Sequence, residues 1–540
     1  MPVFVVALSG PIRAGKSTLA QQMQERLDAR VVKTKELIGH QVKLSSRARS
    51  NLQRAGDKLD RETDGAWVAR ALADVLASDG DHEPQYVVID AVRIAPQIDH
   101  LRKAFPTLIH VHLEANDAEL EKRYAAEVGT VTELESYAAL RKNRTERKIG
   151  GLAKIADVVI ETDRATAEDV YFRVVARLGI RPGTAAPLVD VLIGGQYGSE
   201  GKGNIAHFLA PEYEVLVRVG GPNAGHKVFV DEGEEPYTFH QLPSGALANG
   251  RATLVLGAGA VISLQRLLKE ISELALPTGR LFIDPQAMII EESDVDWEKR
   301  ELRDKIASTA QGVGRATARK ILHRYPGSDV RLARDVPELK HYIEDTVEYF
   351  GDCLSRDRRM LLEGTQGTSL SLHHGHYPHV TSRVTTAPGC LAEAGLAARH
   401  VRRVVMVCRT FPIRVGDTDT GMTSGYMARE VELDYVAARS GIPIEELRKT
   451  ETTSTTKRKR RIAEFDWAQF MKAIVLNGPT DIALTFADYL SIKNREAFRY
   501  EQLTEQTLRF IEELEKVSGI PVSLISTDFA KRNVIDRRAW

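Results

Sequence analysis

The sequence predicts an α/β protein with two P-loop-like domains, each built around a mainly parallel sheet. Apolar runs of strand length alternate with amphipathic stretches of helical length along most of the 540 residues. A glycine-rich loop follows the first apolar run of each half, and a stretch of prolines and small residues separates the halves. We therefore expect a first domain (1–178), a linker (179–187) and a larger second domain (188–540).

Composition limits the classes of protein that the chain can belong to. Seventy-four basic and seventy-four acidic residues balance, so charge gives no reason to expect nucleic acid or a membrane surface as a partner. No apolar run approaches the roughly 20 residues that span a bilayer. The three cysteines form no paired framework, which favours a reduced compartment. We expect a cytoplasmic protein with no membrane and no nucleic-acid partner.

The first domain carries a phosphate-binding loop. Residues 10–18, GPIRAGKST, match G-x-x-x-x-G-K-[ST] between an apolar run and a helical stretch, which is the context that this motif requires. Backbone amides of such a loop cradle nucleotide phosphates, while Lys16 reaches the terminal phosphates and Ser17 binds magnesium. The nucleotide-binding residues predicted here are Gly10, Gly15, Lys16, Ser17 and Thr18.

Other residues of the first domain are open to two interpretations. Asp90 ends the apolar strand VVID and suits a magnesium ion held through its water shell, or it caps the next turn. The basic segment 141–148 either closes over phosphates or is a solvated helix face. With the loop, these features resemble the small P-loop nucleoside and nucleotide kinases. That resemblance implies a phosphoryl acceptor, for which Arg54, Asp57 and Arg61 are candidate ligands.

The second domain opens with a different glycine-rich loop, GGQYGSEGKGN at 194–204, between an apolar run and a helical stretch. Its amides and Lys202 are suited to an anion. It is not the ordinary nucleotide loop, because Gly203 follows the lysine where that motif has Ser or Thr.

Further motifs follow this loop in a definite order, and together they resemble the adenylosuccinate synthetase family over residues 188–540. The resemblance implies a ligase that joins L-aspartate to C6 of a purine nucleoside 5′-monophosphate after a nucleoside triphosphate phosphorylates O6. It also implies Mg²⁺ as cofactor and a homodimer. The motifs are GGPNAGHKV (220–228), HQLPSG (240–245), LEGTQGT (362–368), GHYPHVTSRVTT (375–386), RVG (414–416) and TTKRKRR (455–461).

The resemblance assigns roles residue by residue. Ser199, Lys202 and His226 take the catalytic positions, and Ser199 and the Gly225 carbonyl take the magnesium positions. Positions for the triphosphate are Gly198, Gly201, Gly203 and Asp488. Positions for the purine monophosphate are Asn223, Thr309, Gln366, Thr381, Val415 and Arg458, and those for aspartate are Thr456, Arg458 and Arg460. Without the family context, the run KRKRR would read as a solvated or nucleic-acid-binding stretch.

Ser199 is the departure with the largest consequence, because most of the family has a general-base Asp there and a hydroxyl is a far weaker base. The viral-type aminodeoxyadenylosuccinate synthetases are similar in lacking this Asp, and they accept dGMP. A shift toward dGMP or GMP, ordinary use of IMP, and a catalytically reduced nucleotide sensor all remain open.

Three more departures follow, of which one concerns the triphosphate donor, one has no derived consequence, and one concerns the partner subunit. Phe486 stands where the family has Lys, and Thr527 and Asp528 replace a glycine-containing turn, which leaves GTP, ATP and dATP open as donors. Lys227 replaces a small hydroxyl residue. His323, with Arg324 beside it, takes the place of an Arg that the partner subunit supplies in the family.

Overall fold

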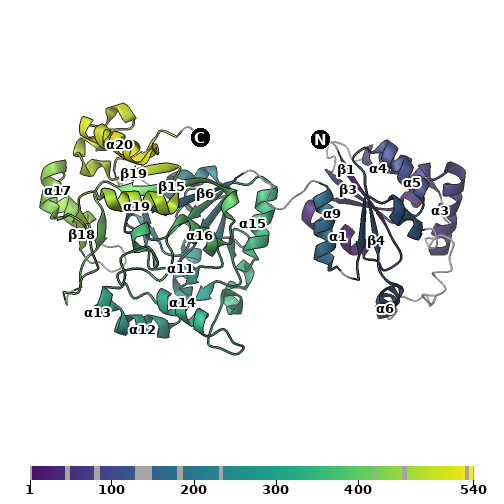
Figure 1. The fold of residues 1–540 in the computed structure, drawn as a ribbon, viewed down its shortest axis with the longest axis horizontal. Coiled ribbons are helices and arrows are strands. Elements are labelled where there is room, and N and C mark those ends of the chain that lie inside the picture. The colour runs from purple at the N-terminus through teal and green to yellow at the C-terminus, as the bar shows by residue number, and fades with distance from the viewer. Residues whose placement is uncertain are drawn as a thin grey trace. The chain divides into compact units, whose positions relative to one another are not determined.

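The chain divides into two compact units, Met1–Arg181 (unit 1) and Pro182–Trp540 (unit 2), and the boundary falls within the predicted linker. Each unit is a mixed α/β structure with a mainly parallel sheet, so the predicted fold class is confirmed (Figure 1). The computed structural model describes residues 3–42, 49–77, 85–127, 149–163, 165–178, 187–229, 235–418, 421–452, 459–528 and 534–538.

The described strands of unit 1 form one parallel sheet in the order β2-β3-β1-β4-β5. Because β1 lies between β3 and β4, the strand order reverses beside it, and the loop after β1 lies at the position where such sheets bind ligands. The strands are β1 (Phe4–Ser9), β2 (Arg30–Lys33), β3 (Tyr86–Asp90), β4 (Ile109–Glu114) and β5 (Val158–Glu161).

Helices cover both faces of this sheet. Val6 and Leu8 of β1 pack with α1 and α9 on one face, whereas Val5 and Ala7 pack with α2, α4 and α5 on the other. Burial on both faces explains why β1 reads as a continuous apolar run. The helices are α1 (Lys16–Leu27), α2 (Thr34–Gln41), α3 (Arg49–Thr63), α4 (Ala66–Ala77), α5 (Ala95–Ala104), α6 (Asp117–Glu127) and α9 (Ala167–Arg177).

Unit 2 is built on a larger sheet, ordered β12-β10-β7-β14-β6-β15-β19-β20-β21 in the described chain. Its pairs are parallel except for β20 with β21. The strands are β6 (Val189–Gly194), β7 (Val215–Arg218), β10 (Thr253–Leu256), β12 (Leu281–Ile283), β14 (Met360–Glu363), β15 (Val401–Arg409), β19 (Asp481–Thr485), β20 (Val522–Ser526) and β21 (Val534–Asp536).

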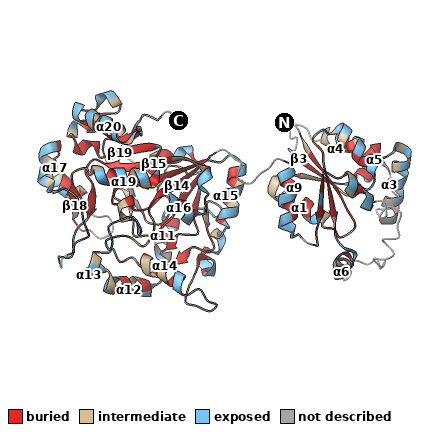
Figure 2. Ribbon diagram, viewed as in Figure 1, coloured by how far each residue is buried: buried red, intermediate tan, exposed pale blue. Residues whose placement is uncertain are grey.

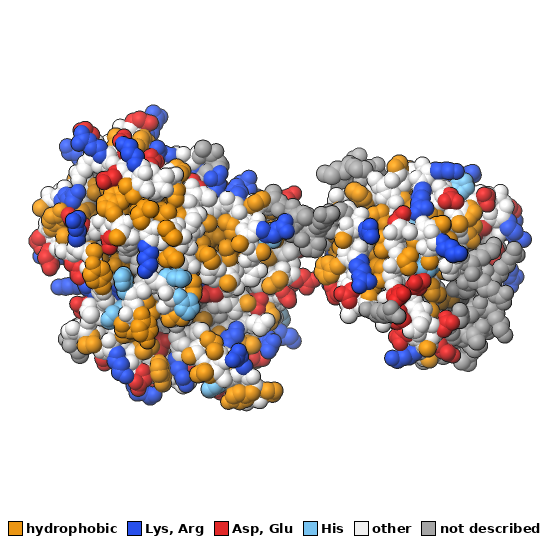
Figure 3. All heavy atoms as spheres, viewed as in Figure 1, with side chains coloured by type: hydrophobic (Ala, Val, Ile, Leu, Met, Phe, Trp, Pro, Cys, Tyr) orange, Lys and Arg blue, Asp and Glu red, His pale blue; other side chains and the backbone are white. Residues whose placement is uncertain are grey.

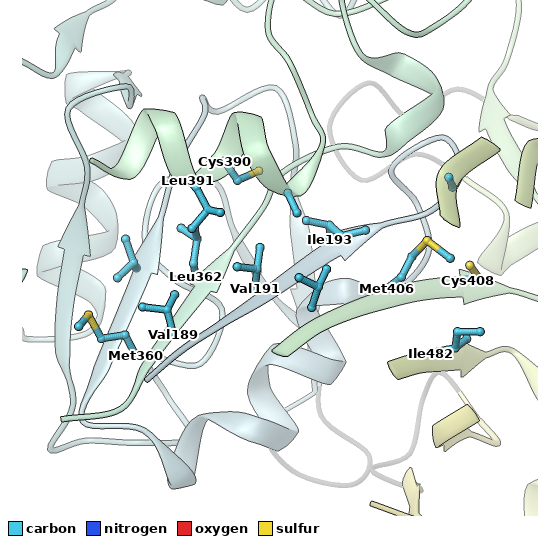
Figure 4. Close-up of a cluster of buried hydrophobic side chains, with 14 of the residues drawn as sticks. Val189, Val191, Ile193, Met360, Leu362, Cys390, Leu391, Met406, Cys408 and Ile482 are labelled. Atoms are coloured by element: carbon cyan, nitrogen blue, oxygen red, sulfur yellow. The ribbon is translucent and has the colours of Figure 1, made fainter. Parts of the chain in front are cut away.

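The core of unit 2 lies on both faces of this sheet. Val189, Val191 and Ile193 of β6 point toward the α16 side, whereas Leu192 belongs to the cluster on the opposite face. Figure 4 shows the first of these clusters, with Leu362 of β14 and Leu391 of α16 packed against β6. The buried strands lie between helices whose outer faces are exposed (Figure 2).

Smaller elements surround the large sheet. Two two-stranded sheets pair β8 (His226–Val228) with β9 (Tyr237–Phe239) and β11 (Val261–Ile262) with β13 (Met288–Ile289), and a third sheet has the order β16 (Ile413–Val415), β18 (Arg460–Ala463), β17 (Glu430–Val431). The helices are α10 (Lys202–Leu209), α11 (Leu264–Glu273), α12 (Glu292–Glu301), α13 (Arg303–Ile306), α14 (Val313–Leu322), α15 (Thr346–Ser355), α16 (Ala387–Ala394), α17 (Leu433–Ser440), α18 (Ile444–Thr450), α19 (Trp467–Asn477) and α20 (Glu505–Ser518).

The surface carries both signs of charge. Basic and acidic side chains are interspersed on the face of each unit in Figure 3, in keeping with their equal numbers in the sequence. Among the residues that the structure describes, no helix is both long and apolar enough to cross a membrane.

Candidate active site

The loop after β1 in unit 1 has the geometry of a phosphate cradle. Gly10 and Gly15 have φ of 132° and 95°, which favour glycine. A Cβ on Gly10 would lie 2.0 Å from the Leu113 carbonyl oxygen of β4, so the loop passes that strand at backbone distance. Lys16 Nζ donates hydrogen bonds to the Gly10 and Pro11 carbonyl oxygens at 2.7 Å each. The lysine therefore folds over the loop at the start of α1.

Ser17 and Asp90 come to the same edge of the unit 1 sheet, because the parallel strands β1 and β3 both end there. Asp90 is only partly buried. Its backbone carbonyl oxygen accepts a hydrogen bond from Thr34 Oγ1 at 2.6 Å. The candidate segment 141–148 lies outside the described residues.

The acceptor candidates on α3 are exposed, and Arg61 Nε bonds the Asp57 carbonyl of its own helix at 3.1 Å. Sequence reasoning missed their neighbour Asp60. Its Oδ1 accepts hydrogen bonds from Trp67 Nε1 at 2.6 Å and Gln97 Nε2 at 2.8 Å. Burial raises the pKa of Asp60 against the effect of these bonds.

In unit 2, the positive charge of Lys202 at the loop between β6 and α10 is neutralised by Glu200 of the same loop. Lys202 Nζ lies 2.8 Å from Glu200 Oε2 and 3.1 Å from the Gly198 carbonyl oxygen. Glu200 Oε1 accepts hydrogen bonds from the Gln196 and Gly198 amides at 3.1 and 2.6 Å. The Lys202 and Glu200 side chains are each 1% exposed. The Glu200 carboxylate thus accepts hydrogen bonds from backbone amides of its own loop. Sequence reasoning missed this role, although Glu200 lies within the glycine-rich motif.

Gly203 explains why this loop lacks the Ser or Thr of the ordinary motif. A Cβ at Gly203 would lie 2.9 Å from the Lys227 carbonyl oxygen and 3.1 Å from His226 Cβ, because β8 passes directly over the start of α10. A side chain at this position would push β8 away. The same close approach brings His226 to the phosphate loop.

His226 is held by a buried carboxylate. Its Nδ1 bonds Glu363 Oε1 of β14, and Ser244 Oγ lies 3.3 Å from the same nitrogen. Burial and Arg218 lower the pKa of His226 to about 4, outweighing the opposite effect of Glu363. Burial opposes ionisation of Glu363, but His226 and Arg218 outweigh it and hold its pKa at about 2. A neutral imidazole therefore donates Nδ1–H to the carboxylate, and Nε2 is buried without a hydrogen-bond partner.

A cavity of about 290 Å³ lies in front of this loop and brings together most of the predicted site residues. Gln366, whose φ is 65°, donates through Nε2 to Thr381 Oγ1 at 2.8 Å. Gln366 Oε1 and Asn223 Oδ1 are buried without hydrogen-bond partners, so both are available to a ligand. The predicted residues that line the cavity are Gly198, Ser199, Gly201, Lys202, Gly203, Asn223, Gly225, His226, Thr309, Gln366, Thr381, Val415 and Arg460.

Other predicted residues are not brought to the cavity. Asp488 is buried, and its Oδ2 accepts hydrogen bonds from Arg495 Nε and Nη2 at 3.0 and 2.9 Å. Burial raises the pKa of Asp488 to about 7 against the effect of Arg495. Phe486 lines the cavity instead. Thr456 and Arg458 lie outside the described residues. His323 Nδ1 bonds Asp329 Oδ1 at 2.5 Å on the surface.

Sequence reasoning also missed a second charged cluster beside the cavity, in which Glu451 contacts Arg409 and Arg460. Arg460 Nη1 lies 3.3 Å from the carboxylate. Arg409 is 42 residues from Glu451 in the chain, so no local spacing could have indicated this pair.

The oxygen atoms that Ser199 and Gly225 offer as ligands fit magnesium that arrives with a nucleotide. Such magnesium takes most of its ligands from phosphate and water, and usually one or two from protein carboxylates. Unit 2 offers a hydroxyl and a backbone carbonyl in their place, which are also hard oxygen ligands. Ser199 and Gly225 both line the unit 2 cavity beside the unpartnered Asn223 oxygen. Within the described ranges, no three His, Cys, Asp or Glu side chains form a metal site of their own. Bound magnesium would neutralise charge on the transferring phosphates.

Unit 2 is similar to known proteins. The adenylosuccinate synthetase family model matches residues 191–333 and 330–496. The adenylosuccinate synthetase of Methanocaldococcus jannaschii is 35% identical over 355 residues, which are 64% of this chain and 96% of that protein. The enzyme of Pyrococcus horikoshii is 34% identical over 358 residues, which are 64% of this chain and 98% of that protein.

Two solved structures resemble the same unit. One is the succinoaminodeoxyadenylate synthetase of cyanophage S-2L bound to dGMP and to dATP as an energy donor, with 30% identity and a TM-score of 0.54 over 66% of this chain and 96% of that chain. The other is the fully ligated adenylosuccinate synthetase of Plasmodium falciparum, with 21% identity and a TM-score of 0.56 over 65% of this chain and 100% of that chain, which shows a common fold.

Proposed function

The chain belongs to the adenylosuccinate synthetase family, and we propose on this premise that unit 2 joins L-aspartate to C6 of dGMP or GMP with hydrolysis of a nucleoside triphosphate. The product would be a 2-amino(deoxy)adenylosuccinate. The observation that carries the proposal is a single cavity lined by Lys202, by His226 and by Ser199 at the position of the family's Asp.

Lys202 and the loop amides suit the phosphoryl-transfer step. The purine 6-oxo oxygen is a poor leaving group, so it must become a phosphate ester before an amine displaces it. A triphosphate that reaches the loop competes with the Glu200 carboxylate for Lys202 and for the amides of Gln196 and Gly198. The phosphate then receives donors that are already aimed at its negative charge.

His226 suits the charge that develops on the O6 phosphate. Its Nδ1 position against Glu363 directs Nε2 away from that carboxylate, and His226 lines the cavity. The neutral ring of the free protein must gain a proton on Nε2 before it can donate a hydrogen bond. An approaching phosphate anion favours that protonation, because opposite charge raises the proton affinity of the imidazole.

Ser199 supports a guanine nucleotide as acceptor. A hydroxymethyl group is smaller than a carboxylate and carries no charge, which leaves room for the 2-amino group of guanine. The similar cyanophage enzyme was solved with dGMP bound. Ordinary IMP-dependent synthesis of adenylosuccinate is the alternative, because the 6-oxo and N1–H edge is the same in both purines.

We propose that unit 2 does not select its triphosphate donor by recognising a guanine base. A carboxylate that reads guanine must offer its oxygens to N1–H and N2–H. Asp488 is buried and is not part of the cavity lining; its Oδ2 is bonded to Arg495, while its Oδ1 has no hydrogen-bond partner. Phe486 lines the cavity where the family has Lys. ATP or dATP is therefore favoured over GTP.

We further propose that both units bind Mg²⁺ with their nucleotides, that the protein forms a homodimer, and that unit 1 has an activity of its own. Mg²⁺ would accompany the phosphates at Ser199 and Gly225 in unit 2 and at Ser17 and Asp90 in unit 1. A homodimer is proposed from the family alone. Unit 1 is proposed to bind a nucleoside triphosphate through its Lys16 loop and to act as a nucleotide kinase.

The test is aspartate-dependent phosphate release by the full chain, scanned over IMP, GMP and dGMP with ATP, dATP and GTP. We expect the highest kcat/KM with dGMP or GMP and with an adenine donor. Turnover with IMP but with neither guanine nucleotide would reject the proposed acceptor preference. If no combination exceeds a Lys202→Ala control, the ligase activity is rejected and a nucleotide sensor is favoured.

A further inference from the structure

Glu451 lies at the centre of a buried ionic cluster at the C-terminal end of α18. Its carboxylate accepts hydrogen bonds from Arg409 Nη2 at 2.7 Å, the Tyr489 hydroxyl at 2.6 Å and Arg460 Nη1 at 3.3 Å. The Glu451 side chain is 0% exposed. Burial opposes ionisation, but the two guanidinium groups outweigh it and hold the pKa of Glu451 at about 2. The carboxylate is therefore a buried anion shared by two cations.

The two arginines are held to different degrees. Arg409 is 1% exposed, its guanidinium lies 3.7 Å from the Phe486 ring centroid, and its Nη1 lies 3.5 Å from the Ser199 carbonyl oxygen. Stacking and burial therefore restrain Arg409 apart from its bond to Glu451. Arg460 is 16% exposed and lines the cavity, and its Nε is buried without a hydrogen-bond partner.

Backbone contacts keep Glu451 and Arg460 in register. The Arg460 amide donates a hydrogen bond to the Glu451 carbonyl oxygen at 3.1 Å. Next to this pair, Thr452 and Lys459 form an antiparallel bridge. Glu451 thus joins the end of α18 to the first residue of β18 through both its main chain and its side chain.

We propose that Glu451 is a positioning residue that aims the Arg460 guanidinium into the cavity, where Arg460 binds a carboxylate of aspartate. The inference rests on the proposed ligase function of unit 2. Guanidinium recognises carboxylate through a planar fork, so small rotations of Arg460 forfeit one of the two bonds. Without the Glu451 charge, two cations would face each other, and Arg460, which is nearer to solvent, would be the one to turn away.

The first test measures KM for aspartate in Glu451→Gln, which keeps the size of the side chain and removes its charge. We expect KM for aspartate to rise about tenfold or more, the size of a lost charge-assisted hydrogen bond, while KM for the purine monophosphate stays within about twofold. The matched control is Tyr489→Phe, which removes a neutral donor from the same carboxylate and leaves the arginine pair intact. It should change KM for aspartate less than about threefold.

A double-mutant cycle with Arg460→Ala separates positioning from general destabilisation. If Glu451 acts through Arg460, Glu451→Gln adds little to the KM increase of Arg460→Ala, whereas independent effects multiply. Multiplied effects, or an unchanged KM in Glu451→Gln, would overturn the inference. If Glu451→Gln does not fold, as judged by thermal unfolding, Glu451→Asp is used in the same cycle. Absence of aspartate-dependent turnover in the wild type would instead reject the proposed function, and this inference with it.

Discussion

The two phosphate loops of this chain follow the same strand-to-helix plan but differ in how their lysines are held. In unit 1, Lys16 bonds two carbonyl oxygens of its own loop, and a serine follows it. In unit 2, Lys202 forms an ion pair with Glu200, and a glycine follows it because β8 lies against the helix start. Two glycine-rich loops with the same strand-to-helix plan can thus hold their lysines through different partners.

The largest expected effect separates the two loops by their lysines. Lys202→Ala should lower aspartate-dependent phosphate release by about 10²- to 10³-fold, because a donor aimed at the transferring phosphoryl group is lost. Lys16→Ala is the matched change in unit 1 and should leave that activity within about twofold while weakening triphosphate binding to unit 1. Initial rates for the two variants, with nucleotide binding to residues 10–18 probed by protection from proteolysis, would check both. Equal losses of ligase activity in the two variants would contradict this division of labour.

Ser199 lies in the unit 2 loop and tests the proposed preference of that unit for a guanine nucleotide as acceptor. Ser199→Asp should lower kcat/KM for dGMP about tenfold relative to IMP, since a larger, charged group would occupy the space left for the 2-amino group. Ser199→Ala preserves that space and serves as the control, so it should keep the preference for the guanine nucleotide. Competition between dGMP and IMP in one reaction measures the ratio directly. A Ser199→Asp variant with an unchanged ratio would show that another residue sets the preference.

Exchanging the residue after each lysine tests the packing difference. Gly203→Ser should lower the free energy of unfolding by about 1–3 kcal/mol, because its Cβ would press on the Lys227 carbonyl and on His226. The reciprocal Ser17→Gly should cost at most about 0.5 kcal/mol, because Ser17 is exposed in the first turn of α1 and serine differs little from glycine in helix propensity. Chemical denaturation of both variants compares the two costs. If Gly203→Ser is the milder change, the approach of β8 does not determine that glycine.

The last comparison concerns the pH dependence of stability, and it involves a buried histidine near each loop. Burial lowers the pKa of His112 in unit 1 and of His226 in unit 2 from 6.5 to about 4. The unfolded chain then binds more protons between these values, so the free energy of unfolding should fall as pH drops from about 6.5 to about 4. His112→Gln should give a shallower fall than the wild type. Parallel curves for the two proteins would contradict a neutral, buried His112.

Much of each loop could be predicted from sequence because its determinants are local. Gly10, Gly15 and Lys16 lie within a few residues of one another, and the motif between strand and helix specifies the backbone that they form. The Ser199 substitution was equally visible, because its neighbours in the loop set the alignment. Roles that depend on distant partners were not predictable in this way.

Glu363 illustrates the limit. It bonds His226 across 137 residues of sequence, and the pairing of β14 with β6 and β7 brings it to the loop. Glu451 and Arg409 likewise meet only when the end of α18 packs against the end of β15. The Arg495 partner of Asp488 Oδ2 was likewise missed, although the contact of Asp488 with a triphosphate stays a prediction.

The sequence by itself determined the α/β class, two glycine loops that each follow an apolar strand, and the order of motifs that identifies the family. The class and the loops arise from backbone preferences and hydrophobic period, which act over a few residues, whereas the motif order identifies the family by resemblance. Only the tertiary structure decided that Glu200 fills the amides of its own loop, that Nε2 of His226 is unpartnered, and that Gly203 must lack a side chain. Those outcomes depend on which distant segments the parallel sheet places side by side, and on the water that their packing excludes.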